Sequence, residues 1–276
     1  MKHQPAPIPN GFLVGDLWVR QAEIRQLNGY DEQLLAKIHG YFSPVKTTLL
    51  LERVTSFGEL TQKLDLHLTI RRLTVGDRLA LILQLRKVTL GDIMHSVLQC
   101  PKCKEQLSFD MSVDSLLQPA TQNPQTEYAL NLEGVSLTVR PITGFDLEAV
   151  DSNPDLGNLK EQLLRGCIVA SKPALPVTLS SQLQESISLK LAEIDPQAEI
   201  VLSVQCPACN GVFQVPFDVE DYFYREITAR YRQLEREVHW IAFHYHWSEK
   251  AILYLSMGKR KHYIDMINTT LSGEGF

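Results

Sequence analysis

The chain has 276 residues, a formal net charge of −5 and 44% hydrophobic residues. This balance is typical of a folded globular protein and excludes disordered, collagen-like and low-complexity classes. The acidic charge disfavours a nucleic-acid-binding protein, because such domains are usually basic. No apolar run approaches the roughly 18–20 residues that a membrane span needs.

The N-terminal segment, residues 1–10, is rich in proline, and we expect it to be flexible. It lacks the basic stretch and apolar core that mark a secretory signal peptide. We therefore expect a cytoplasmic protein.

The predicted elements alternate between strands and helices along the first half of the chain. Apolar residues recur at helical spacing after Asp31 and again after Thr74, where Thr-Val-Gly-Asp is typical of a helix start. In chain order we expect strands within 12–26, helices from Asp31, over 46–54 and from Thr74, and a strand over 93–98. Residues 118–127, with two prolines, form the predicted linker.

The second half follows a similar order. We expect a hairpin within 129–141 that turns at Gly134, helices over 159–170 and from Ser180 or Ser181 to Ile194, and a strand over 199–205. After Pro216 the chain becomes a long helical tail with an apolar stripe.

Four of the five cysteines form two Cys-Pro-x-Cys pairs, Cys100 with Cys103 and Cys206 with Cys209. In a chain without an export signal, such pairs are typical of metal ligands or redox centres rather than of structural disulfides. The fifth, Cys167, lies in an apolar stretch and is expected to be a small buried core residue.

Short patterns recur in the same order around these pairs. The offset is 120 residues for Val-Arg at 19 and 139, 115 for Leu27–Asp31 and Ile142–Asp146, 113 for the paired leucines at 50 and 163, and 106 for the cysteines. An offset that shrinks steadily indicates a diverged duplication of roughly 110 residues, whereas coincidence among short patterns is the alternative. The predicted fold is therefore α+β: repeat 1 at 11–117, repeat 2 at 128–216, and an all-α interaction module at 217–276.

Each cysteine pair supplies only two ligands, while a structural zinc ion takes four in a tetrahedron. Two strand-turn-strand knuckles, one from each repeat, would together complete a four-cysteine zinc site that joins the repeats. A redox pair would instead sit at the start of a helix, where the helix dipole lowers a thiol pKa. Strand-like alternation follows both pairs, which favours zinc over redox chemistry or vestigial cysteines.

The end of the long tail helix carries a cluster of aromatic and histidine side chains. We predict that partner binding uses Trp240, His244, Tyr245 and Trp247. The alternative is that these rings have no binding role and only fill the turn between two helices of the same chain. A metal or catalytic role for the histidines lacks a supporting pattern such as His-Glu-x-x-His.

Two segments carry a resemblance to a known family: TIRRLTVGDRLALILQLRKVTLGD at 69–92, followed by Cys-Pro-Lys-Cys, and REVHWIAFHYHWSEKAIL at 236–253. They resemble baseplate and tail-assembly proteins of contractile-tailed phages and of related bacterial contractile injection systems. In that family a glycine commonly follows the knuckle, as Gly211 does, whereas Lys104-Glu105 departs from the pattern.

The resemblance implies a non-enzymatic structural or assembly role, with baseplate, tube or spike proteins of the same particle as partners. It leaves open whether the chain is a permanent subunit or an assembly factor that departs. The alternatives are a zinc-ribbon adaptor in transcription or RNA metabolism and, third, a thiol oxidoreductase.

Overall fold

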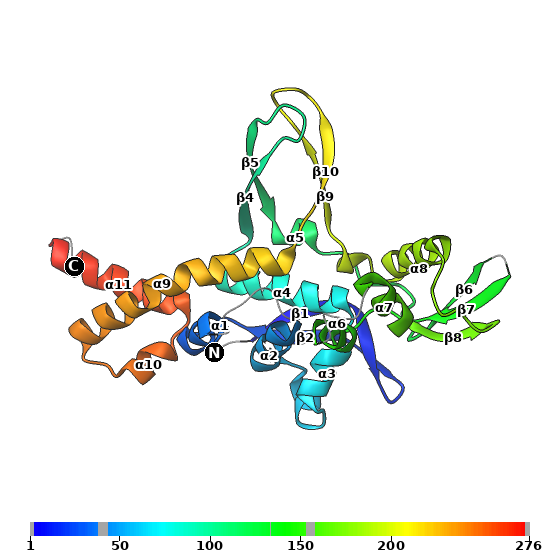
Figure 1. The fold of residues 1–276 in the computed structure, drawn as a ribbon. Coiled ribbons are helices and arrows are strands. Elements are labelled where there is room, and N and C mark those ends of the chain that lie inside the picture. Colours follow the sequence, from blue (N-terminus) through cyan, green and yellow to red (C-terminus); the bar gives the residue numbers. More distant parts are fainter. Residues whose placement is uncertain (1–2, 38–43, 133, 153–157, 274–276) are drawn as a thin grey trace.

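The computed structural model describes residues 3–37, 44–132, 134–152 and 158–273. Figure 1 shows an outline like a T, in which two β-hairpins form an upright stalk above a horizontal bar. The bar carries a helical arm at one end and the second repeat at the other. Helices and four small antiparallel sheets make up the described part, which confirms the predicted α+β class.

The first repeat builds the centre of the bar and half of the stalk. Its sheet has the strand order β1-β2-β3, and α4 lies against β1 and β2. Its elements are β1 (His3–Val14), β2 (Leu17–Arg25), α1 (Gly29–Lys37), α2 (Pro44–Val54), β3 (Thr55–Ser56), η1 (Gly58–Gln62), α3 (Leu66–Arg72), α4 (Val75–Leu90), β4 (Ile93–Gln99), β5 (Gln106–Ser112) and α5 (Val113–Leu116).

Helix α4 begins where the sequence predicts, because Thr74 caps it: the amide of Asp77 donates to Thr74 Oγ1 at 3.1 Å. Its Leu81, Ile82 and Leu83 are fully buried in the main hydrophobic core. Burial on neighbouring positions shows that this helix is packed on several sides rather than along one stripe.

The expectation of a flexible N-terminus is wrong for residues 3–10, which belong to β1. Pro5 pairs with Glu23 and Pro7 with Gln21 across the ladder. Since β1 is an edge strand and the prolines occupy every second position, their missing N–H groups all fall on one side, where no neighbouring strand needs them. The first two residues lie outside the described part.

The elements of the second repeat begin, like those of the first, with two strands, two helices and a third strand, but a single α-helix then stands where the first repeat has two. In chain order these elements are β6 (Tyr128–Leu132), β7 (Val135–Val139), α6 (Gly144–Asp151), α7 (Leu159–Gly166), β8 (Ile168–Lys172), α8 (Ser181–Ile194), η2 (Pro196–Ala198), β9 (Val201–Gln205) and β10 (Val212–Pro216). Its sheet order, β6-β7-β8, corresponds strand by strand to β1-β2-β3. The helix predicted over 159–170 ends at Gly166, because the β-branched Ile168 and Val169 belong to a strand paired with β7.

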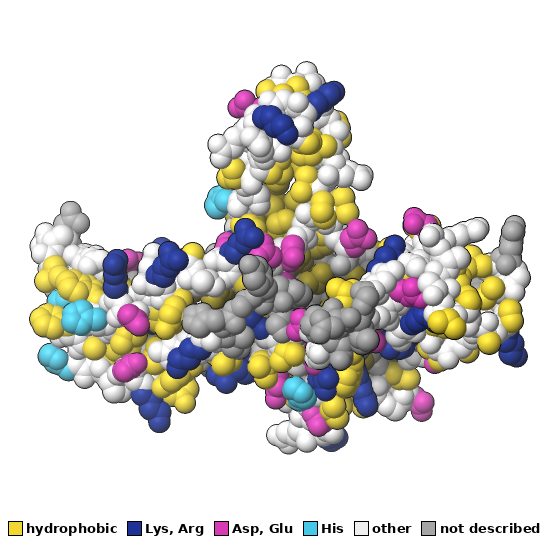
Figure 2. Space-filling model, in the orientation of Figure 1, with side chains coloured by type: hydrophobic (Ala, Val, Ile, Leu, Met, Phe, Trp, Pro, Cys, Tyr) yellow, Lys and Arg dark blue, Asp and Glu magenta, His cyan; other side chains and the backbone are white. Residues whose placement is uncertain are grey.

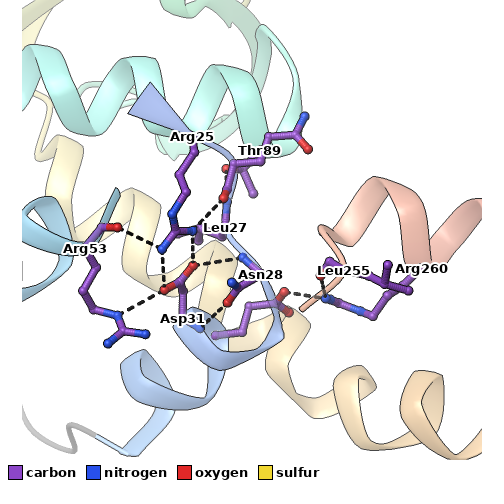
Figure 3. A network of polar contacts seen from close by, with 10 residues as sticks. Arg25, Leu27, Asn28, Asp31, Arg53, Thr89, Leu255 and Arg260 are labelled. Atoms are coloured by element: carbon purple, nitrogen blue, oxygen red, sulfur yellow. Dashed lines mark hydrogen bonds and ion pairs between the residues drawn. The ribbon is translucent and has the colours of Figure 1, made fainter. Parts of the chain in front are cut away.

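One ion pair occurs at the same place in both repeats. Arg25 Nη1 lies 2.6 Å from Asp31 Oδ2, and Arg140 Nη1 lies 2.8 Å from Asp146 Oδ2 (Figure 3 shows the first pair). Arg25 is the last residue of β2 and Arg140 directly follows β7, and each aspartate lies in the first turn of the next helix. In both repeats the arginine also donates to a carbonyl at the end of the second helix, that of Arg53 or Gly166. These shared contacts support the duplication, and they make Arg25 rather than Arg20 the counterpart of Arg140, at the same offset of 115 residues as Asp31 and Asp146.

The tail consists of α9 (Val219–Tyr245), α10 (Glu249–Leu253) and α11 (Met257–Ser272). Its beginning is not a separate unit, because Phe223, Tyr224 and Ile227 are buried in the same core as β1 and α4. The boundary expected at 217 therefore marks a change in secondary structure and not in packing. Only the far half of α9, with α10 and α11, forms the projecting arm (Figure 1). Within the described residues, every helix is too short or too polar to span a membrane.

Candidate metal centre

The two cysteine pairs lie at the tips of the hairpins that form the stalk (Figure 1). Strands β4 and β5 pair from Ile93 with Ser112 up to Gln99 with Gln106. Strands β9 and β10 pair in the same way below the second cysteine pair. Each pair thus sits in a strand-turn-strand knuckle, as the sequence predicts.

The two knuckles share one backbone conformation. The amide of Cys100 donates to the carbonyl of Glu105 at 2.8 Å, and the amide of Lys104 donates to the carbonyl of Cys100 at 3.0 Å. The equivalent pairs of the second knuckle make both bonds at 2.9 Å. Lys104 and Asn210 both take a positive φ, 67° and 53°. The departure of Lys104-Glu105 from the family pattern therefore does not change the turn.

The four sulfur atoms of these cysteines converge on one point, all within 4.8 Å of one another. Cys100 Sγ lies 3.8 Å from Cys209 Sγ, and Cys103 Sγ lies 3.6 Å from Cys206 Sγ. Four sulfurs at about 2.3 Å from a tetrahedral ion stand about 3.8 Å apart, whereas a disulfide needs about 2.05 Å. The spacing fits one four-coordinate metal ion, and each short distance joins the two repeats.

The cluster is sheltered on its inner side. Cys100 and Cys206 are fully buried, while Cys103 is exposed at the tip. The side chains packed around the sulfurs are apolar: Leu98, Leu107, Val204 and Phe213. This packing restricts the cysteine rotamers and keeps water from one side of the site, which favours a structural ion.

The thiols of the first knuckle have strongly different proton affinities. The N–H of Cys103 points at Cys100 and lowers the pKa of that thiol to about 6. The N–H of Glu105 lowers the pKa of Cys103, but local desolvation of the sulfur and the three neighbouring thiols outweigh it and raise that pKa to about 12. Adjacent sulfurs resist ionising together, and a divalent cation among them would remove this resistance by neutralising their charge.

The remaining cysteine, Cys167, takes no part in the cluster. It is fully buried in the core of the second repeat, beside Leu164 and Val139. Burial raises the pKa of its thiol to about 12. The residue therefore behaves as a small apolar side chain, in line with the sequence analysis.

The four residues predicted to bind a partner all lie at the elbow between α9 and α10. Trp240 packs against His244, with ring centroids 4.7 Å apart, and Tyr245 stacks on Trp247 at 5.2 Å. Tyr263 of α11 contacts both Tyr245 and Trp247. The rings thus fill part of the elbow, yet Trp247 remains 37% exposed. Their role in partner binding stays a prediction.

A buried acidic contact between the repeats is not predicted from the sequence. Asp195 of the second repeat accepts hydrogen bonds from the amide of Gly76 at 2.9 Å and from the Asn10 side chain at 2.7 Å. Asp77 accepts the amide of Asn10 at 2.8 Å, and burial raises the pKa of Asp77 to about 8. The sequence carries little signal for this contact, because aspartates are common in the first turn of a helix, where Asp77 lies, and beside a turn, where Asp195 precedes Pro196.

Comparison with known proteins gives one family match. Residues 57–168 match a family described as T4 bacteriophage base plate protein. The matched part includes the first knuckle and leaves the second knuckle and the tail outside. No curated protein and no solved structure gave a match. The match confirms the expected resemblance to a phage baseplate protein family, and it does not address the zinc ribbon or the tail string.

Proposed function

We propose that this chain is a non-enzymatic structural or assembly component of a baseplate, either of a phage tail or of a related contractile injection system. The match of residues 57–168 to the T4 bacteriophage base plate protein family carries the proposal. Its partners are then baseplate, tube or spike proteins of the same particle. The chain acts in the cytoplasm, where such particles are assembled.

The four-cysteine centre holds one structural zinc ion in this proposal. Four thiolates in a tetrahedron are a preferred ligand set for zinc, and four-cysteine sites are typically structural. The ligands come from two repeats, with Cys100 and Cys209 separated by 109 positions in the chain. A bound ion therefore closes a long loop and holds the two hairpins as one stalk.

The stalk is suited to contact with other proteins of the particle. It stands away from the bar, and Figure 2 shows hydrophobic side chains along it. Val97 and Val212 are 61% and 67% exposed on its strands. Exposed apolar side chains of this kind gain free energy when a partner covers them. Lys102 and Lys104 add positive charge at the tip.

The thiol oxidoreductase alternative has less support. Redox cysteine pairs depend on a helix start, whose dipole lowers a thiol pKa. Here both pairs lie between strands, so the dipole contribution is missing. A zinc-ribbon adaptor in transcription or RNA metabolism would need a basic surface around the knuckles. The basic residues next to the knuckles are the lysines at 102 and 104, which is little positive charge for that role.

The test is made on particles assembled with the wild-type chain, without the chain, and with serine at all four knuckle cysteines. Quantitative mass spectrometry of purified particles measures whether the chain is retained, and electron microscopy measures whether baseplates are complete. A permanent subunit is retained at a fixed ratio to the sheath. An assembly factor is absent from particles but required for their baseplates. Complete, functional baseplates formed without the chain would overturn the proposal.

A further inference from the structure

A small joint connects the second repeat to the first. Thr143, which precedes α6, forms an isolated antiparallel bridge with Thr74, which precedes α4. Two backbone hydrogen bonds flank the bridge, donated by the amides of Val75 at 2.9 Å and Gly144 at 3.2 Å. The start of one helix is thereby held on the start of another.

An isolated bridge also attaches the helical arm to the first repeat, at the opposite end of the bar (Figure 1). Asn28, which precedes α1, forms an isolated antiparallel bridge with Ser256, which precedes α11. Asn28 and Thr143 are equivalent positions of the two repeats, 115 residues apart. Within the described residues, these two are the isolated bridges outside the named strands.

A glycine follows the bridge residue in both helix starts, because the opposite element comes too close for a side chain: a Cβ would meet the Leu253 side chain at Gly29 and the Arg78 guanidinium at Gly144, with backbone next nearest. A Cβ on Gly29 would lie 3.2 Å from the carbonyl oxygen of Leu253, and one on Gly144 would lie 3.0 Å from that of Arg71. Leu253 and Arg71 hold the same place, three residues before the bridging Ser256 or Thr74. The next residue in each helix start is aromatic: Tyr30 packs on Tyr254, and Phe145 lies under the guanidinium of Arg71. The two contacted residues differ by one position in the alignment of the joints.

Both joints also bury an arginine four residues after the bridge. Arg260 is completely buried and donates to Glu32 of α1 at 2.7 Å and to Glu237 of α9 at 2.8 Å. Figure 3 shows Arg260 beside the start of α1. Arg78 is 2% exposed and donates to Thr48 Oγ1 and to the carbonyl of Pro44, both in α2, at 2.8 Å. An arginine out of water requires such partners. Arg260 thereby ties α11 to the docked helix α1, whereas Arg78 is held by α2 and lies against Gly144 at the docked helix start.

The sequences of the two docking elements agree once the joints are aligned. The pattern Ile-x-x-Leu-Thr-x-Gly-x-Arg covers residues 70–78, and Ile-x-x-Leu-Ser-x-Gly-x-Arg covers 252–260, with a constant offset of 182. The equivalent segment of the second repeat, 176–184, reads PVTLSSQLQ and lacks the isoleucine, glycine and arginine. Its Ser180 is exposed and bridges to no other strand or helix start in the described part. The pattern is thus present in the two segments that bridge to the start of another helix, 70–78 and 252–260, and absent from the segment that does not.

We infer that the hairpin of α10 and α11 is a third copy of the docking element formed by α3 and α4. Its partner is the start of α1 in this same chain, recognised by the glycine and the aromatic residue that follows it. The bar of the T is therefore three units connected by two copies of one joint. This inference does not depend on the proposed function. It restricts partner binding by the arm to its outer side, where Phe243 and Trp247 are exposed.

The first test uses the full-length protein and compares two substitutions in α1, one at the joint and one away from it. Gly29→Ala places a methyl group against the side chain and backbone of Leu253, whereas Lys37→Ala shortens an exposed side chain at the other end of the helix. Hydrogen exchange of the amides in 249–260 should accelerate by about tenfold or more in the first variant and remain unchanged in the second. Gly144→Ala should have the same effect on 70–78. Unchanged exchange in Gly29→Ala would overturn the inference.

The second test exchanges copies of the element. Ser256→Thr, Met257→Val and Lys259→Asp together write the first-repeat string Thr-Val-Gly-Asp-Arg into α11. Met257→Ser, Gly258→Gln, Lys259→Leu and Arg260→Gln write the second-repeat string instead. The first exchange should keep the protection of 249–260 and the second should lose it. Equal loss or equal retention would contradict a shared joint, and zinc content, measured in parallel, reports whether the rest of each variant is folded.

Discussion

Phe223 provides a direct measure of how deeply the tail helix is anchored in the body of the protein. Its side chain is 1% exposed and packs in the main core, so Phe223→Ala removes buried apolar area and leaves a cavity. Complete burial of such a side chain contributes roughly 1.5–3 kcal/mol, and the cavity adds to the loss. We expect the free energy of unfolding to fall by about 3–5 kcal/mol, a large share of the stability of an ordinary domain.

Phe243 in the same helix is the matched control, because its side chain is 66% exposed. Both substitutions gain the same small helix propensity of alanine, so this contribution cancels in the comparison. Phe243→Ala should change the free energy of unfolding by about 0.5 kcal/mol or less. Urea unfolding followed by circular dichroism measures both. A loss below about 1 kcal/mol for Phe223→Ala would show that α9 is an appended helix rather than part of the core.

Three further predictions concern charges and the isolated cysteine. Asp31 is fully buried between two arginines, so Asp31→Asn should cost about 3–5 kcal/mol in urea unfolding, whereas Asp221→Asn in an exposed pair should cost about 1 kcal/mol or less; similar losses would contradict the burial. Burial opposes the ionisation of Asp146, but Arg140 outweighs it and holds the folded-state pKa below the ordinary value. Its stabilisation is therefore complete above the unfolded-state pKa of about 3.9, and the stability difference between wild type and Asp146→Asn should shrink as the pH falls below that value; a difference that grows would reverse the sign. Cys167 should resist iodoacetamide in the native protein, since its thiol is buried and its pKa is raised, and rapid alkylation read by mass spectrometry would refute this.

The cysteine cluster can be predicted from the sequence, whereas much of the tertiary packing cannot. The Cys-Pro-x-Cys strings at 100 and 206 carry their own geometry, because each fixes a tight turn between two strands. The duplication then supplies the reason why the two half-sites meet. Neither argument depends on knowing which helices pack together, so both can be made from the sequence alone.

Elements whose conformation depends on distant partners are the ones that the sequence does not reveal. Pro5 and Pro7 suggest an irregular segment. They lie in the edge strand β1, where their missing N–H groups cost no hydrogen bond to a neighbouring strand. Ile168 continues a helical pattern in the sequence but pairs with Val139 of β7. Its β-branched side chain favours a strand once a neighbouring strand is present to pair with. Arg260 belongs to a basic string that is typical of a solvated face, and only the fold brings Glu32 to it.

The zinc content of four purified proteins tests the central claim most directly. The wild-type chain, the pair Cys100→Ser and Cys103→Ser, and the pair Cys206→Ser and Cys209→Ser are measured by plasma emission spectrometry, with Cys167→Ser as a control that keeps the cluster intact. One shared site predicts one zinc per chain in the wild type and in the control, and none in either double variant. Half of the wild-type zinc retained by each double variant would mean two independent sites, and the stalk would not be joined by a metal ion.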